Sequence, residues 1–235
     1  METGILYGMN YSFEYSFSFC GRKTLGITVL PDGKVEVRAP YDVNREQIEM
    51  KLRKRSAWIL KQQEYFRTFE VNMPPRRYIS GESHYYLGRQ YLLHVSEGHP
   101  NSVSYEGHSF NIVCSPKSKA GELMKAWYFE RAKIKFIEIA KPIIERFTCY
   151  NVKPSVIHIQ KMEFRWGSCT TKGKLILNAE LIKTAKPCIK YVITHELCHL
   201  VHRNHTKEFY ELLEKEMPDW KRWKEKLERI SYMIE

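Results

Sequence analysis

Two histidines separated by three residues stand in the segment His195-Glu196-Leu197-Cys198-His199 of this 235-residue chain. An α-helix turns about 100° per residue, so side chains four positions apart lie on one face and both imidazoles can reach one metal ion. Glu196 follows the first histidine directly, where its carboxylate can take a proton from a metal-bound water. This H-E-x-x-H pattern is typical of zinc-dependent hydrolases. It predicts a metal site on a helix, with His195 and His199 as ligands and Glu196 as general base.

The residues around the motif favour a buried helix. Pro187 stands where a proline is tolerated in the first turn of a helix. Apolar side chains then recur at helical spacing, which indicates one face packed against a core; they are Ile189, Val192, Ile193, Leu197, Leu200 and Val201. A helix buried in this way suits a metal site shielded from bulk water.

Two further histidines compete for the third ligand position. His202 faces the metal side if the helix continues, whereas His205 can reach the ion only if the chain turns near Arg203-Asn204. Asparagine tolerates the left-handed conformation that ends many helices, so such a turn is compatible with the sequence. A ligand from beyond a turn completes a tetrahedron better than one crowded on the same helix, so we favour His205. Glu208 is a further carboxylate candidate.

The chain is basic, with 38 Lys and Arg against 27 Asp and Glu and a formal net charge of +11. This balance suits an anionic partner such as a nucleotide, a nucleic acid or an acidic protein. A solvated basic surface explains the charge equally well, because the cations are spread along the chain. The densest basic helix face is expected between Lys51 and Arg67.

Several classes of protein are excluded or disfavoured. The sequence has no run of about 18 apolar residues, so we expect no transmembrane helix. Its first residues lack a basic region followed by an apolar core, so we expect no signal peptide and a cytoplasmic protein. The six cysteines form no C-x-x-C pair, which argues against a zinc ribbon and a disulfide framework.

Hydrophobic periodicity predicts an α+β fold with two parts. A β-rich region with one long helix is expected over residues 1–115, and a helix–sheet–helix domain that carries the motif over residues 116–235. Pro74-Pro75-Arg76-Arg77 predicts a linker inside the first part. Pro142 predicts a kink or break in the helix expected over residues 121–147 of the second part. We find no internal repeat in the side-chain pattern. The expected strands are 11–19, 25–30, 34–38, 83–87, 91–95, 102–105, 109–114, 156–160 and 174–178. The expected helices are 45–69, 121–147, one that begins at about residue 186 and carries the motif, 208–216 and 220–230.

Four segments together resemble one known family. They are Arg165-Trp166-Gly167-Ser168-Cys169, Leu177-Asn178, His195 through Leu200, and Asn204-His205, in this order and spacing. The sequence is similar to the YgjP-like metallopeptidase family, which belongs with the SprT-like and WLM metallopeptidases, and the likeness extends from about Lys23 to the last helices. This resemblance implies a zincin-like core of the gluzincin type. It also implies one zinc ion per chain held by His195, His199 and His205, with Glu196 as the base.

Three functions remain open from the sequence. The first is a zinc peptidase acting on a peptide or protein, in which Arg165 or Tyr191 stabilises the oxyanion and Asn178 contacts the substrate. In this reading the strand 175–178 either binds an extended peptide by strand addition or is an ordinary buried strand. The second is a metal-dependent UTP pyrophosphatase, an activity linked to members of the family. The third is a DNA-associated protease like those of the SprT-like group, anchored by the basic helix face.

Overall fold

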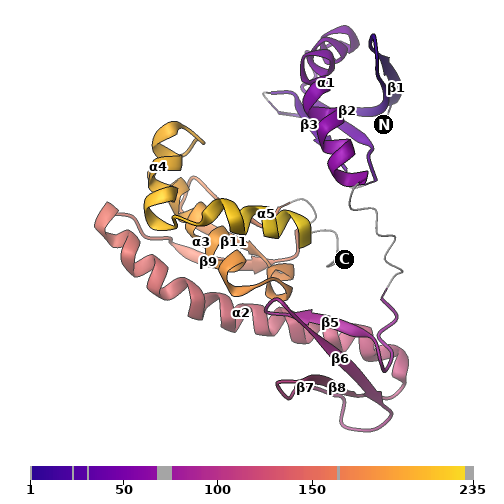
Figure 1. The fold of residues 1–235 in the computed structure, drawn as a ribbon, viewed down its shortest axis with the longest axis vertical. Helices are drawn as coiled ribbons and strands as arrows, with labels where there is room; N and C mark the ends of the chain where they lie inside the picture. Colours follow the sequence, from indigo (N-terminus) through magenta and orange to yellow (C-terminus); the bar gives the residue numbers. More distant parts are fainter. Residues whose placement is uncertain (1, 23, 31, 68–75, 163–164, 231–235) are drawn as a thin grey trace. The chain divides into compact units, whose positions relative to one another are not determined.

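The computed structural model describes residues 2–22, 24–30, 32–67, 76–162 and 165–230 (Figure 1). The chain divides into two compact units, Met1–Met73 and Pro74–Glu235. The architecture is mixed α+β with three small sheets and five α-helices among the described residues, so the predicted fold class is confirmed. No described helix is both long and apolar enough to cross a membrane.

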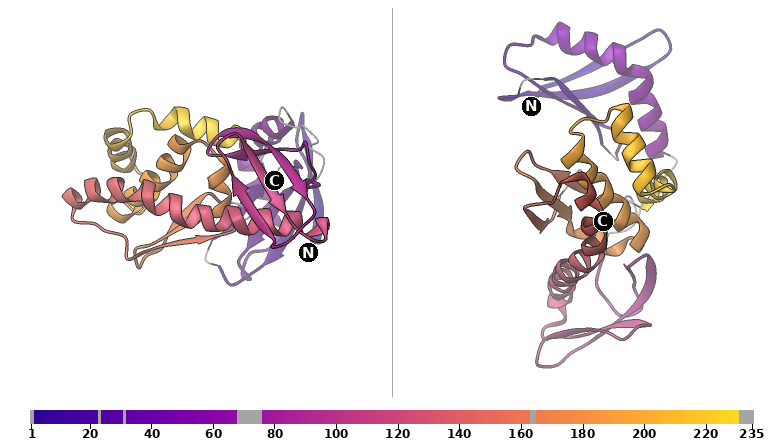
Figure 2. Two further views of the ribbon diagram at one scale, coloured as in Figure 1. Left: turned by 90° about the horizontal axis from the view of Figure 1, so that it is seen from below. Right: turned by 90° about the vertical axis from the view of Figure 1, so that its left-hand side faces the viewer.

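The first unit is a four-stranded sheet with one helix packed on it. Its strands are β1 (Glu2–Tyr7), β2 (Ser12–Phe19), β3 (Gly26–Val29) and β4 (Val35–Ala39), in the order β1-β2-β4-β3. Alternate strand residues such as Tyr15 and Val37 are buried together with Ile48 and Leu52 of helix α1 (Arg45–Arg67), as period-2 strands and an amphipathic helix require. Figure 2 shows this sheet and helix from two further directions.

The start of helix α1 follows the sequence prediction closely. The backbone N–H of Gln47 donates to the Asn44 side chain at 2.9 Å, and the Asn44 N–H donates to the Gln47 side chain at 3.1 Å. This reciprocal pair satisfies two backbone donors at the helix start, so the predicted N-cap at Asn44 is confirmed. Strand β1 was not predicted, because Leu6 is its only buried residue and the strand therefore shows no alternation.

The second unit contains the remaining two sheets and four helices. The first sheet has the order β5-β6-β8-β7, with strands β5 (Ser83–Tyr86), β6 (Arg89–Ser96), β7 (Ser102–Tyr105) and β8 (Ser109–Val113). The second has the order β10-β11-β9, with strands β9 (Val156–Gln160), β10 (Gly167–Cys169) and β11 (Lys174–Asn178). The helices are α2 (Ala120–Phe147), α3 (Lys186–Val201), α4 (Lys207–Glu216) and α5 (Trp220–Ile230), with short 3₁₀ turns η1 (Lys117–Lys119), η2 (Thr148–Tyr150) and η3 (Ala179–Lys183).

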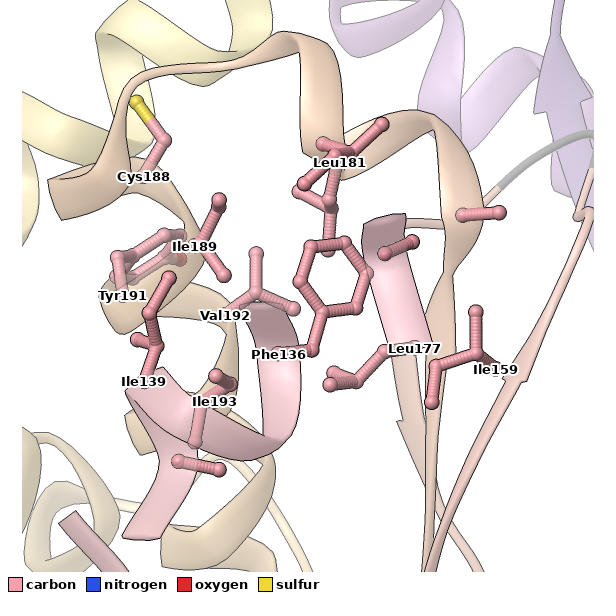
Figure 3. Packing of buried hydrophobic residues seen from close by; sticks show 14 of the residues in the cluster. Phe136, Ile139, Ile159, Leu177, Leu181, Cys188, Ile189, Tyr191, Val192 and Ile193 are labelled. Atoms are coloured by element: carbon pink, nitrogen blue, oxygen red, sulfur yellow. The ribbon is translucent and has the colours of Figure 1, made fainter. Parts of the chain in front are cut away.

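The core of the second unit holds helix α3 in place. Figure 3 shows Phe136 of α2, Leu177 of β11 and Leu181 of η3 packed around Ile189 and Val192 of α3. Helix α2 continues through Pro142 to Phe147, so of the expected kink or break the break does not occur. The metal-site helix is thus backed by a long helix and by the small sheet.

Removing the ring at the centre of this core should destabilise the second unit. Phe136 is fully buried, and truncation of a buried Phe typically costs about 3–5 kcal/mol because both transfer free energy and packing are lost. We expect Phe136→Ala to lower the free energy of unfolding by about that amount, measured by urea unfolding. The exposed Ile137 next to it provides a matched control, since Ile137→Ala should change stability far less.

The boundary between the compact units lies at residues 73 and 74, before the position near 115 that the sequence suggested. Strands β5–β8 share one hydrophobic core with α2 and α3, as fully buried Phe110 illustrates. The β5–β6 turn also joins η3, where the N–H of Leu87 donates to Ile182 O at 2.9 Å and that of Gly88 to Lys183 O at 3.1 Å. The alternation of apolar and polar residues predicts that these segments are strands, but it does not predict which helices they pack against. Of the predicted linker, residues 74 and 75 lie outside the described residues.

The two four-stranded sheets repeat one topology, although no repeat was expected from the sequence. In each, the outer pairs are antiparallel, the central pair is parallel and a long helix follows the last strand. The repeat therefore exists in strand order and strand direction, and no residue pattern in the sequence reveals it.

Candidate active site

Helix α3 places two histidines one turn apart, and the chain beyond it returns a third. The ring centroids of His195 and His199 are 5.0 Å apart. The helix ends at Val201 because His202 adopts an extended backbone (φ −124°, ψ 106°), and the chain then turns through residues 203–204. This turn brings His205 Nε2 to 3.1 Å from His195 Nε2, and its ring to 4.7 Å from that of His199. One ring nitrogen from each histidine lies within 4.8 Å of the others.

The other two candidate ligands lie outside this three-histidine cluster. The His202 N–H donates to Cys198 O at 2.8 Å, and its carbonyl lies 3.3 Å from His199 Nδ1. Donation from Nδ1 to that carbonyl leaves His199 Nε2 free to bind an ion, which is how metal-binding histidines are commonly oriented. Glu208 is exposed at the start of α4. The turn forms without the expected left-handed Asn204, since Asn204 is not among the described residues with positive φ.

The three histidines fit a divalent metal ion such as zinc. Burial lowers the pKa of His195 to about 3 and also lowers that of His199, so both imidazoles stay neutral, the form that binds metal. Nitrogens on a tetrahedral zinc ion at about 2.0–2.1 Å are roughly 3.4 Å apart, close to the 3.1 Å between His195 and His205. Three protein ligands leave a fourth position open, which is the arrangement of catalytic rather than structural zinc.

Phe209 of helix α4 supports all three rings from one side. Its ring centroid lies 5.0 Å from that of His195, 4.7 Å from His199 and 4.8 Å from His205. The side chain is fully buried, so its position is fixed by packing. Helix α4 therefore orients the histidine cluster without supplying a ligand to it.

Glu196 is held beside the histidines by strand β10. Its side chain is 7% exposed, and its carboxylate accepts a hydrogen bond from the Cys169 backbone N–H. Burial raises the pKa of Glu196 to about 7, while the nearby positive charge of Arg165 acts in the opposite direction. A carboxyl group with a pKa near neutrality can both accept and return a proton, as general acid–base catalysis requires.

Gly167 allows this close approach of the strand to the glutamate. A Cβ atom at residue 167 would lie 2.8 Å from Cγ and Oε1 of Glu196 and 2.8 Å from Cγ1 of Val192. These separations are shorter than van der Waals contact, so any larger residue must displace Glu196 or the strand.

We therefore expect Gly167→Ala to lower catalytic activity about tenfold or more while leaving the histidines in place, because small displacements of a catalytic group cost large rate factors. Steady-state hydrolysis with parallel metal analysis measures this effect. Gly21→Ala is the control, because a Cβ atom at residue 21 has no neighbouring atom within 4 Å, and this variant should keep full activity. Gly107→Ala is unsuitable, because the φ of +87° at residue 107 would strain an alanine. Wild-type activity in Gly167→Ala would mean that Glu196 does not need its present position.

A pocket of about 400 Å³ opens over the histidines and Glu196. Strand β10 and the residues after it form one wall, and helix α3 with the turn to His205 forms the other. Its lining residues are Arg165, Gly167, Ser168, Cys169, Thr170, Thr171, His195, Glu196, His199, Leu200, Arg203 and His205.

The family model for the YgjP-like metallopeptidase domain matches residues 23–230. The chain belongs to the YgjP-like family. The resemblance inferred from the four sequence segments is thereby confirmed, including its extent. No curated protein matches the chain. Family membership implies a hydrolase that uses a metal ion and acts on protein.

In this YgjP-like domain, Arg165 lines the pocket but Asn178 and Tyr191 are not part of its lining. Asn178 is 4% exposed, and its Nδ2 donates to the carbonyls of Met162 at 2.8 Å and Arg165 at 2.9 Å. Tyr191 is buried, with its ring stacked on Trp220 and 5.8 Å from the His195 ring. Asn178 thus fixes the backbone of the segment that carries Arg165. Tyr191 packs against the ring of His195 inside the core.

The strand that can accept an extended peptide is β10 rather than 175–178. Strand β11, which contains residues 175–178, is central in its sheet and pairs with β10 on one side and β9 on the other. The backbone N–H and C=O groups of β11 already pair with these two neighbours. Residues 175–178 therefore form an ordinary internal strand, the second of the two alternatives that the sequence left open. Strand β10 is at the edge of the sheet, and its residues line the pocket.

Sequence reasoning had not assigned roles to Gly167, Cys169 or Phe209. A glycine inside a strand often marks a close approach of backbone to another group, but β10 was not among the predicted strands, so Gly167 did not stand out. The donor from Cys169 is a backbone N–H, which no side-chain pattern can reveal. Phe209 looked like an ordinary core residue of an amphipathic helix.

Proposed function

We propose that the protein is a zinc-dependent peptidase that binds one zinc ion per chain through His195, His199 and His205. The observation that carries this proposal is the convergence of three imidazole nitrogens beside a buried carboxyl group in an open pocket. Three imidazole donors with one coordination position left open match catalytic zinc sites. Membership in a metallopeptidase family supports the same reading.

Zinc bound at this site would lower the pKa of the attacking water and polarise the scissile carbonyl. Glu196 takes the proton from that water, because its carboxyl group is buried next to the ligands and has a pKa near neutrality. The same group then delivers the proton to the leaving amine. The Cys169 N–H holds the carboxylate in orientation, and Arg165 in the pocket wall supplies positive charge for the developing oxyanion.

Substrate would bind as an extended strand along β10. An edge strand has outward N–H and C=O groups that can form a ladder with a peptide. On β10 the Cys169 N–H already donates to Glu196, so a peptide would pair with the other outward groups of the strand. Because residues 167–169 line the pocket, a peptide paired there passes the histidine cluster and Glu196. An unfolded segment meets this requirement better than a folded domain, so unfolded protein is the expected substrate.

A test of the site combines metal analysis with X-ray absorption at the zinc edge. The proposal expects one zinc per chain with about three nitrogen neighbours and one oxygen neighbour at 2.0–2.2 Å. Chelation should abolish cleavage of unfolded protein, and stoichiometric zinc should restore it. A sulfur neighbour at about 2.3 Å would contradict the ligand set.

Hydrolysis of a nucleotide such as UTP is a second candidate, favoured by the two arginines in the pocket lining. Arg165 and Arg203 can both bind phosphate, since the guanidinium group matches its geometry. Production of UMP and pyrophosphate by the zinc-loaded protein, lost in Glu196→Gln, would establish this activity in place of peptide hydrolysis.

A further inference from the structure

The rim of the pocket is positively charged. Apart from the histidines, Glu196, Arg165 and Arg203 are the ionisable Asp, Glu, Lys or Arg residues of its lining, and Glu196 is buried whereas both arginines are exposed. Neither arginine forms an ion pair with any residue in the described part of the chain. An unpaired guanidinium group at the mouth of a binding pocket is available to a carboxylate of the ligand.

Both arginines line the pocket that strand β10 borders, with Arg165 just before the strand in the chain and Arg203 in the turn after helix α3. Arg165 precedes Gly167 by two residues and lies near Glu196, whose burial-raised pKa its charge opposes. Arg203 lies near Cys169, the last residue of the strand; burial raises the pKa of this thiol, and Arg203 opposes that shift too. Strand β10 spans roughly 7 Å at about 3.3 Å per residue. A peptide paired along it therefore passes both cations of the pocket lining.

We infer that this pocket selects peptides with Asp or Glu within about two residues of the scissile bond, bound by Arg165 and Arg203 of the pocket lining. This inference rests on the proposed peptidase function. It adds the charge of the substrate, which a metal site and an edge strand do not determine by themselves. Backbone pairing with β10 accepts any sequence, so side-chain preference must come from residues at the rim.

The expected preference is moderate because both arginines are exposed. Exposed ion pairs contribute at most about 1 kcal/mol, which corresponds to about fivefold in kcat/KM for each arginine. Salt screens such pairs, so the preference should shrink between low and high ionic strength.

Three fluorogenic peptides that differ only at the two positions flanking the scissile bond test the inference. One carries Glu, one carries isosteric Gln and one carries Lys at both positions. The zinc-loaded wild type should cleave them in the order Glu, Gln, Lys. Arg203→Gln should narrow the gap in kcat/KM between the Glu and Gln peptides about fivefold. Arg165→Gln should narrow this gap as well, together with a loss of kcat shared by all three peptides, because Arg165 also serves the oxyanion. Arg203→Glu should raise kcat/KM for the Lys peptide relative to the Glu peptide.

A matched control removes one positive charge elsewhere on the same unit. Lys190 is exposed on helix α3 and outside the pocket lining, so Lys190→Gln should keep the wild-type order. Equal cleavage of all three peptides by wild type, or an unchanged order in Arg203→Glu, would overturn the inference.

Binding measurements separate this inference from the proposed function. Fluorescence anisotropy of the same peptides on zinc-loaded Glu196→Gln should give the affinity order Glu, Gln, Lys without any turnover. If no peptide is cleaved by wild type but this order holds, the peptidase proposal fails and the charge preference stands. If peptides are cleaved but bind with equal affinity, the charge preference fails and the peptidase proposal stands.

Discussion

Glu196→Gln should lower kcat/KM for hydrolysis of unfolded protein by about 10²–10⁴-fold, the range that loss of a positioned general base typically costs. Glutamine keeps the size of the side chain and can still meet the Cys169 N–H through its carbonyl oxygen. It cannot accept the proton of the attacking water. The measurement is release of peptide fragments by the zinc-loaded variant and wild type at equal zinc content.

The fold and the metal site should survive this substitution. The proposed zinc ligands are the three clustered histidines and not Glu196, so zinc stoichiometry should stay at the wild-type value. Glu211→Gln on helix α4 is a matched control, because Glu211 is an exposed carboxylate that pairs with Lys207 and lies outside the pocket lining. A Glu196→Gln variant that kept more than a tenth of wild-type activity would show that another group takes the proton.

His205→Ala should weaken zinc binding by at least about 100-fold, because even loss of a group that only supports a ligand costs 10–100-fold. His205 is exposed, so the apo protein should unfold like the wild type. Zinc that binds only the folded state at 100 times its Kd adds about 2.7 kcal/mol of stability. The wild type should therefore gain thermal stability on zinc addition, whereas His205→Ala should gain little.

His202→Ala is the matched control for this experiment. It removes an imidazole three residues away from His205 and keeps the backbone carbonyl that lies near His199 Nδ1. Because His202 lies outside the three-histidine cluster, this variant should bind zinc like the wild type. Loss of zinc affinity in His202→Ala with retention in His205→Ala would reverse our choice of third ligand.

The local part of the site could be predicted from the sequence, because helix geometry alone brings His195 and His199 to one face. The third histidine depended on where the helix ends. The structure ends it at Val201 through an extended His202, not through a left-handed Asn204. A short segment without glycine or proline gives little warning of such a stop, so the sequence left His202 and His205 both open.

Features that depend on partners distant in the chain were harder to predict. Alternation identified most strands, but it could not place β11 in the centre and β10 at the edge of their sheet. It also could not assign β5–β8 to the core shared with α2 and α3, because the burial of Phe110 depends on its tertiary neighbours. The repeated strand order of the two four-stranded sheets was not predictable for the same reason, because alternation identifies strands but not the order in which they pair.

A direct test of the central claim offers unfolded protein and UTP in separate reactions to the wild type loaded with one equivalent of zinc. Our account predicts fragments from the protein and intact UTP over the same time course, with the protein cleavage abolished by a chelator. UTP hydrolysis with no cleavage of protein would contradict a peptidase and assign the three histidines and Glu196 to phosphate chemistry.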